Sequence, residues 1–176
     1  MKEGIIMLQN PEPIDMLRII RISIQDYIKT FHEIIIRKDK IYKGKKIYHN
    51  ERIYQYLAAL GLAKEYDYEV ILDNDIKWKG LSKNVDIALF ENDKPIYLME
   101  FKIWREQPIV PHEHDIFNLL KYDEFIGKLF VVLTIQHEDN INKNENDLKT
   151  KIRPGFIKES IELGNKLTFD IYGFKI

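Results

Sequence analysis

The chain contains 176 residues, of which 45% are hydrophobic and 12% aromatic, and this is enough apolar material for one domain with a core. It has no cysteine, which excludes disulfide bonds and thiolate metal sites. The formal net charge is -1, so the overall charge does not predict binding to nucleic acid. No apolar run reaches the roughly 18 residues of a membrane span, and the first residues do not open a signal peptide. We therefore expect a cytoplasmic protein that does not bind membranes.

A long amphipathic helix is predicted from about Glu12 to Arg37, after a short apolar segment at residues 5–8. Its apolar residues recur at helical spacing. This helix could cover a sheet or form a dimer contact. The basic stretch at residues 38–46 has two interpretations, a solvated linker or a loop that contacts phosphates.

A second helix is expected at residues 51–60, because Asn50 can cap its start and Gly61 can end it. Alternating apolar residues then predict a strand at residues 66–72. The segment that follows could touch nucleic acid or pack against the core, and its candidate side chains are Lys77, Trp78 and Lys79.

Two apolar segments contain charges that a buried strand would not be expected to carry. The segment 84–90 contains Asp86, and the segment 95–104 contains Glu100 and Lys102 near its end. Turn-forming residues separate the two segments, which predicts a β-hairpin. Because side chains alternate between the faces of a strand, Glu100 and Lys102 project from the same face. An interior strand seldom carries such charges without a functional reason.

The loop of this hairpin decides whether Asp86 lies opposite Glu100. A two-residue loop at residues 92–93 would place Asp86 opposite Met99, whereas an odd-length loop or a β-bulge in either strand would place it opposite Glu100. Two carboxylates about 4 Å apart repel by roughly 4 kcal/mol at an effective dielectric constant near 20. A divalent cation between them removes this repulsion, and oxygen ligands suit Mg²⁺ or Mn²⁺. Lys102 could then stabilise charge on a bound phosphate or position a water.

The pattern of Asp86 followed by Glu100-Phe101-Lys102, on the two strands of a hairpin, resembles the PD-(D/E)XK nuclease superfamily. This superfamily includes restriction endonucleases, Holliday-junction resolvases and recombination exonucleases. Its core is a helix, three strands in a meander, a crossover helix and a further strand. The resemblance covers roughly residues 47–136, and it departs from the family pattern at Val85, where the family's namesake proline is absent.

The resemblance implies an α/β, restriction-endonuclease-like fold with an αβββαβ core, in which helices flank a central mixed sheet. It implies that Asp86, Glu100 and the backbone carbonyl of Phe101 bind Mg²⁺ or Mn²⁺, and that Lys102 acts at the scissile phosphate. In the family, an acidic residue on the first core helix often completes the metal site, and Glu51 is the candidate by position. Alternatively, Glu51 stabilises the helix macrodipole from the first turn. DNA is the expected substrate on the resemblance alone.

After the hairpin, the sequence predicts a crossover helix at residues 115–126, ended by Gly127, and a buried parallel strand at residues 129–135. The resemblance implies that polar residues of this helix approach the catalytic centre, which makes Lys121 a secondary candidate. His112 and His114 could be metal ligands, but they lack the spacing that puts two ligands on one helical face, which favours a polar start of the helix. Because this segment follows the strand of Glu100 and Lys102, it could still lie near the active site.

The C-terminal part of the sequence extends this core. Residues 138–147 are polar and are expected to be mobile, although a ligand could order them, and helical segments are predicted at residues 148–152 and 156–163. A strand is predicted at residues 167–176. The core would thus carry an extra N-terminal helix and a C-terminal αβ extension. Because no internal repeat is found, residues 1–176 are expected to form a single domain.

The main functional hypothesis is a metal-dependent nuclease that hydrolyses phosphodiester bonds of nucleic acid. The first alternative is a catalytically silent nuclease-fold subunit that acts as a binding or assembly module in a nucleic-acid-processing or defence complex. The second is a structural ion pair between Glu100 and Lys102. The near-neutral charge leaves open whether basic residues gather on one face, the substrate is not duplex DNA, or a partner subunit brings a basic surface. A homodimer also remains open.

Overall fold

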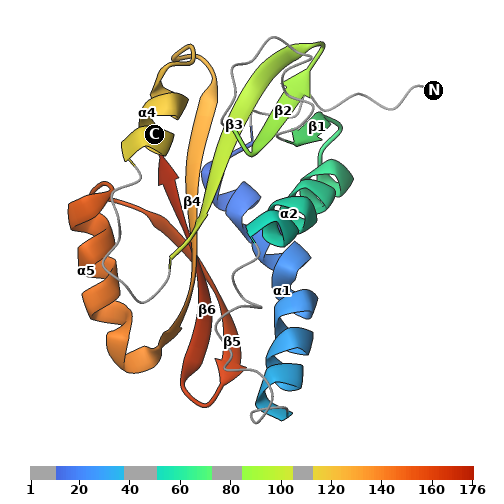
Figure 1. Cartoon of the computed structure of the whole chain (residues 1–176). Helices are drawn as coiled ribbons and strands as arrows, with labels where there is room; N and C mark the ends of the chain where they lie inside the picture. Colours follow the sequence, from blue (N-terminus) through green and yellow to red (C-terminus); the bar gives the residue numbers. More distant parts are fainter. Residues whose placement is uncertain (1–10, 38–50, 73–84, 105–112) are drawn as a thin grey trace.

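The computed structural model describes residues 11–37, 51–72, 85–104 and 113–176. In this part of the chain, no helix is long and apolar enough to cross a membrane. The elements follow one another in the order shown in Figure 1. They are α1 (Pro13–Arg37), α2 (Glu51–Glu65), β1 (Glu69–Leu72), β2 (Ile87–Glu91), β3 (Lys94–Ile103), α4 (Glu113–Leu120), β4 (Gly127–His137), the 3₁₀-helix η3 (Glu138–Asn140), α5 (Ile141–Lys151), β5 (Ile157–Gly164) and β6 (Leu167–Lys175).

The strands form one six-stranded mixed sheet in the order β1-β2-β3-β4-β6-β5. Strands β3 and β4 are parallel, and α4 lies between them in the chain as the predicted crossover. The other neighbouring strands pair antiparallel. The predicted α/β class, with a mixed sheet between helices, is therefore confirmed.

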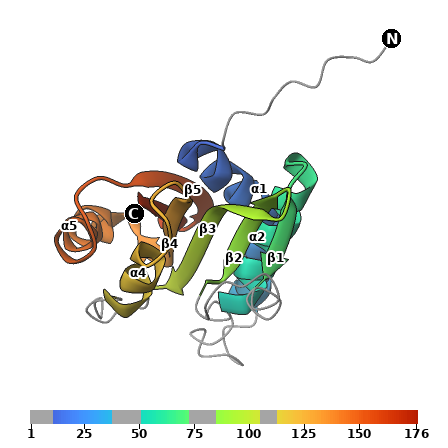
Figure 2. The same cartoon turned by 90° about the horizontal axis from the view of Figure 1, so that it is seen from above.

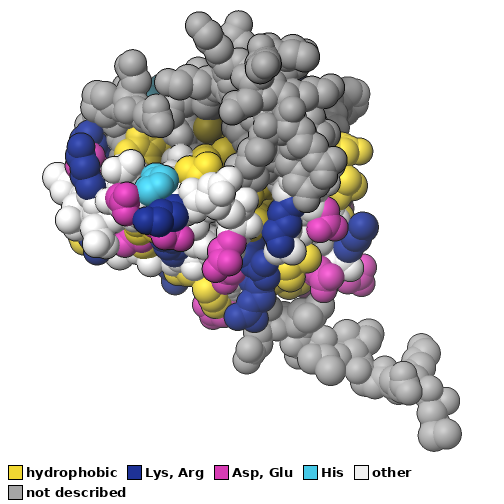
Figure 3. Space-filling view, turned by 90° about the horizontal axis from the view of Figure 1, so that it is seen from below, with side chains coloured by type: hydrophobic (Ala, Val, Ile, Leu, Met, Phe, Trp, Pro, Cys, Tyr) yellow, Lys and Arg dark blue, Asp and Glu magenta, His cyan; other side chains and the backbone are white. Residues whose placement is uncertain are grey.

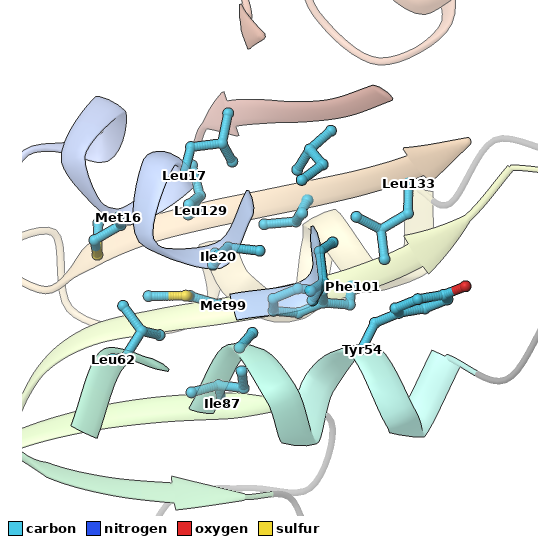
Figure 4. Packing of buried hydrophobic residues seen from close by; sticks show 14 of the residues in the cluster. Met16, Leu17, Ile20, Tyr54, Leu62, Ile87, Met99, Phe101, Leu129 and Leu133 are labelled. Carbon is cyan, nitrogen blue, oxygen red and sulfur yellow. The ribbon is translucent and has the colours of Figure 1, made fainter. Parts of the chain in front are cut away.

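Helices cover both faces of this sheet. Helices α1 and α2 lie on one face, and α4 and α5 lie on the other (Figures 1 and 2). The core between the sheet and the first pair of helices is continuous and apolar. Figure 4 shows this packing, in which α1 and α2 contribute Met16, Leu17, Ile20, Tyr54 and Leu62, and the strands contribute Ile87, Met99, Phe101, Leu129 and Leu133.

Helix α2 corrects the prediction that Gly61 ends the second helix, because the helix continues to Glu65. Gly61 is buried where α2 crosses α1, and a Cβ atom at this position would overlap the side chain of Ser23. The glycine therefore marks a close approach of two helices, not a helix end. The sequence shows a glycine in either case, so the local pattern could not separate the two interpretations.

The C-terminal extension also differs from the prediction. Residues 138–147, where no helix was predicted, form η3 and most of α5, and residues 156–163, expected to be helical, belong mainly to β5. A tight turn at Asn165 and Lys166, both with positive φ, joins β5 to β6. The extension is thus a helix followed by a β-hairpin, because pairing with β6 overrides the weak helical pattern of β5.

The crossover helix is shorter than predicted. Helix α4 ends at Leu120, and Gly127 begins β4 instead of ending the helix. A turn held by Asp123 follows the helix, since its side chain accepts a hydrogen bond from the Phe125 amide at 2.9 Å. Lys121 consequently lies just after the helix, not within it.

A buried polar cluster joins β4, β5 and β6 on the face that α5 covers. Asp170 is fully buried, and it accepts hydrogen bonds from Ser160 Oγ at 2.6 Å, from Thr168 Oγ1 at 3.1 Å and from Gln136 Nε2. Lys158 Nζ lies 3.3 Å from its Oδ2. Both carboxylate oxygens are thus satisfied, which is the condition under which a buried charge is tolerated.

We predict that Asp170→Ala lowers the free energy of unfolding by roughly 3 kcal/mol or more, because several buried donors and one ammonium lose their shared acceptor. Urea unfolding followed by circular dichroism measures this loss. Glu162→Ala, at an exposed position of β5, is the control and should change stability by less than about 0.5 kcal/mol. A loss below about 1 kcal/mol for Asp170→Ala would show that the cluster is not a structural constraint.

Candidate active site

The β2–β3 hairpin contains a two-residue turn. Glu91 pairs with Lys94, and the two turn residues between them, Asn92 and Asp93, have φ values of 50° and 62°. Positive φ at both central positions is typical of the type I′ turns that join antiparallel strands. By itself, this turn would place Asp86 opposite a residue on the apolar face of β3, away from Glu100.

A β-bulge then changes the register of the hairpin. The pairing shifts by one residue between Leu89 and Phe90, which leaves Ile96 as an extra residue on β3. Beyond the bulge, the register places Asp86, one residue before β2, level with Glu100. Of the alternatives left open by the sequence, the structure therefore contains the bulge.

Asp86 is held against β3 by the backbone. Its amide donates to the carbonyl oxygen of Met99 at 3.0 Å, and its Oδ2 accepts from the amide of Phe101 at 2.7 Å. The hydrogen bond from β3 thus fixes the position of the Asp86 carboxylate beside the start of β2. Phe101 itself is fully buried, and its ring packs under α1 and α2.

Glu100 is a buried carboxylate whose two oxygens have different surroundings. Its Oε1 lies 3.1 Å from Lys102 Nζ, while its Oε2 is buried without a hydrogen-bond partner among the described residues. Only 4% of Glu100 is exposed. Burial, and then the charge of Asp86, raise the pKa of Glu100 to about 8, although Lys102 acts in the opposite direction. An unpaired oxygen in such a setting favours a proton or a metal cation.

Lys102 lies among three carboxylates. Its Nζ is 3.1 Å from Glu100, 3.5 Å from Asp115 and 3.7 Å from Glu51. Burial alone would lower the pKa of Lys102, but the charges of Glu100, Glu51 and Asp115 outweigh burial and raise it above the usual value. The side chain is therefore a fixed positive charge over the neutral pH range.

Glu51 reaches the site from the first turn of α2. Its Oε2 accepts from the amide of Ile103 at 3.1 Å, and its Oε1 lies near Lys102 and 3.5 Å from Gln55 Nε2. The side chain thus ties the start of α2 to the end of β3. Glu51 also lies in the first turn of α2, where its charge stabilises the helix macrodipole, and its role as a metal ligand stays a prediction.

Helix α4 brings two residues to this region that the sequence analysis did not assign to the site. Asp115 contacts Lys102, although the sequence predicted only that it begins a helix. Asn118, one turn later, is 5% exposed, and its Nδ2 has no hydrogen-bond partner among the described residues. Its Oδ1 accepts from Lys121 Nζ at 3.0 Å. Helical spacing after the Glu-x-Lys strand is the signal that could have identified both residues.

The other sequence candidates are placed as follows. His114 and Lys121 have exposed side chains, and Lys121 donates a hydrogen bond to Asn118. The remaining candidates, namely residues 38–46, Lys77, Trp78, Lys79 and His112, lie outside the described residues.

The possible metal ligands of this site are carboxylate oxygens. Within the described residues, no group of three or more His, Asp or Glu side chains is arranged to hold a metal ion by itself. Asp86 and Glu100 supply two carboxylates, one of which has the unpaired Oε2. Such a pair fits Mg²⁺ or Mn²⁺, since Mg²⁺ in particular keeps several waters and is often bound by one or two carboxylates and substrate phosphates.

The charges on the surface are mixed. Figure 3 shows one face of the molecule, on which Lys and Arg side chains lie among Asp and Glu side chains. Several Lys and Arg side chains adjoin one another below the centre of this view, with Asp and Glu side chains beside them.

Comparison with known proteins found no match, either to a family model, to a curated protein or to a solved structure.

We predict that Glu100→Gln stabilises the protein more at high pH than at low pH. Because the pKa of Glu100 is raised, the folded state binds a proton that the unfolded state releases, and stability falls as pH rises from about 4.5 to about 8. Glutamine removes this loss. The difference in unfolding free energy between variant and wild type should grow by roughly 2–5 kcal/mol from pH 5 to pH 9.

Chelator-treated protein, unfolded in urea at each pH, provides the measurement. The exposed Glu91 on β2 supplies the control. The difference in unfolding free energy between Glu91→Gln and the wild type should stay nearly constant with pH. A difference for Glu100→Gln that is equally flat would contradict the buried-carboxylate interpretation.

Proposed function

We propose that this protein is a metal-dependent nuclease of the PD-(D/E)XK type, with DNA as the expected substrate. The observation that carries the proposal is the bulged hairpin that sets Asp86 level with Glu100, with Lys102 beside them on β3. The order α2-β1-β2-β3-α4-β4 supports it further, because it follows the helix, three strands, crossover helix and strand of that family.

Asp86, Glu100 and the backbone carbonyl of Phe101 would hold Mg²⁺ or Mn²⁺, with Glu51 as a further candidate ligand. A bound divalent cation lowers the pKa of a coordinated water and polarises the phosphate. The chain's contribution is to fix these oxygens. The Phe101 amide orients Asp86, and the buried Oε2 of Glu100 has no competing partner among the described residues.

Lys102 would stabilise negative charge at the scissile phosphate or orient the attacking water. Its ammonium group is kept charged by the three surrounding carboxylates. A preorganised cation of this kind stabilises charge that develops in a transition state without any reorganisation of water. It does not accept the proton of the attacking water, because an ammonium has no free lone pair.

The two alternatives are weighed by different observations. The net charge of -1 and the mixed surface charge favour a silent binding or assembly module that takes its nucleic-acid contacts from a partner. The unpaired Oε2 argues against a purely structural ion pair. A structural cluster should satisfy its buried charges, as Asp170 does on β6.

We predict that Asp86→Asn weakens Mn²⁺ binding and abolishes nuclease activity, because the amide removes one of the two charges that attract the cation. Calorimetric titration of Mn²⁺ should show affinity at least about 10-fold weaker than in the wild type. Incubation with mixed single- and double-stranded DNA and RNA should show metal-dependent cleavage by the wild type and none by Asp86→Asn.

The matched control is Glu91→Gln, an exposed carboxylate on the same hairpin, which should bind and cleave as the wild type does. Binding without cleavage of any substrate would favour the assembly module. If the wild type binds no Mn²⁺ even with nucleic acid present, the nuclease proposal is wrong.

A further inference from the structure

Asp115 approaches Lys102 from a different element than the other charges of the site. Its Oδ2 lies 3.5 Å from Lys102 Nζ, and the two side chains are 20% and 21% exposed. Asp115 stands in the first turn and a half of α4, which follows the carboxyl end of β3 in the chain. The ion pair therefore joins the crossover helix to the strand that carries Glu100 and Lys102.

The three carboxylates around Lys102 differ in how they attract its ammonium group. Glu100 is two residues away on the same strand and face, so this pair needs only the local strand geometry. Asp115 and Glu51 instead depend on the tertiary packing of α4 and α2 against β3. Without them, Glu100 would be the one carboxylate among the described residues that forms an ion pair with the ammonium group.

Pairing with Glu100 alone would conflict with the binding of a cation. Lys102 and a divalent cation would compete for the same buried carboxylate, and both are positive charges within a few ångströms of it. In the structure, Lys102 contacts Oε1, and Oε2 remains without a partner among the described residues. The additional pull of Asp115 and Glu51 is consistent with this division of the two oxygens.

We propose that Asp115 is a positioning residue that holds the Lys102 ammonium away from the second oxygen of Glu100 and beside the substrate phosphate. This inference rests on the proposed function of the site. In this proposal Asp115 acts through its contact with Lys102 and not as a ligand of the cation. Its role is that of an outer partner, of the kind whose loss typically costs 10- to 100-fold in metal affinity or activity.

A double-mutant cycle on Mn²⁺ affinity tests the inference without any cleavage assay. Asp115→Asn should weaken Mn²⁺ binding by about tenfold when Lys102 is present. In the Lys102→Met background, the same change should weaken binding by less than about twofold, because no ammonium is left to compete. A direct effect of the lost charge would instead appear equally in both backgrounds, and that result would overturn the proposal.

Activity supplies a second readout that a structural role would not move in the same way. With cleavable nucleic acid, Asp115→Asn should lower kcat by about 10- to 100-fold with little change in KM. Asp115→Glu, which keeps the carboxylate, should recover most of the activity. Equal losses in both variants, or a change in KM alone, would count against positioning through Lys102.

A control variant and the behaviour of the wild type separate a failure of this inference from a failure of the proposed function. Glu124→Gln removes an exposed carboxylate from the segment that follows α4, and it should leave binding and cleavage unchanged. Thermal melting followed by circular dichroism verifies that each variant is folded. If the wild type itself binds no Mn²⁺, the proposed function fails and this inference with it. If the wild type binds Mn²⁺ and the two substitutions are additive, only this inference fails.

Discussion

The β-bulge in the β2–β3 hairpin is the constraint on which the candidate site depends. Directly opposed residues of antiparallel strands share a face, so a shift of one residue moves a side chain to the other face of the sheet. In an unbulged hairpin, Asp86 would lie opposite Met99, whose side chain is in the apolar core under α1 and α2. The extra residue on β3 instead brings Asp86 level with Glu100. With the bulge, Asp86 and Glu100 form an acidic pair; without it, the carboxylate of Asp86 would be buried in the apolar core.

The charges at the end of β3 depend on tertiary packing. Lys102 contacts carboxylates from β3, α2 and α4, and Glu51 also accepts a hydrogen bond from the amide of Ile103. Helices α2 and α4 lie on opposite faces of the sheet, and the first turn of each lies near Lys102 at the end of β3. The position of α4 follows from the parallel β3–α4–β4 crossover, which returns the chain over the strand that it has just left.

Two buried carboxylates in the same sheet differ in how their oxygen atoms are satisfied. Asp170 is fully buried, but hydroxyl, amide and ammonium groups satisfy both of its oxygens. Glu100 is nearly as buried, and one of its oxygens has no partner among the described residues. Folding alone would select against that arrangement, because a buried unpaired oxygen costs free energy. Departures from local consistency of this kind concentrate at functional sites.

The sequence by itself determined the central part of the sheet, because long apolar runs, turn residues and a crossover spacing are local signals. It also singled out Asp86, Glu100 and Lys102, since charges within apolar strands are visible without a structure. It did not determine the strand β5, the helical contact at Gly61 or the role of Asp115. Each of these depends on a partner that is distant in the sequence, namely β6 for the strand, α1 for the glycine and Lys102 for the aspartate. Only the tertiary structure determined the bulge. The alternative registers of the β2–β3 hairpin differ in how the whole sheet packs, and not in any residue of the turn.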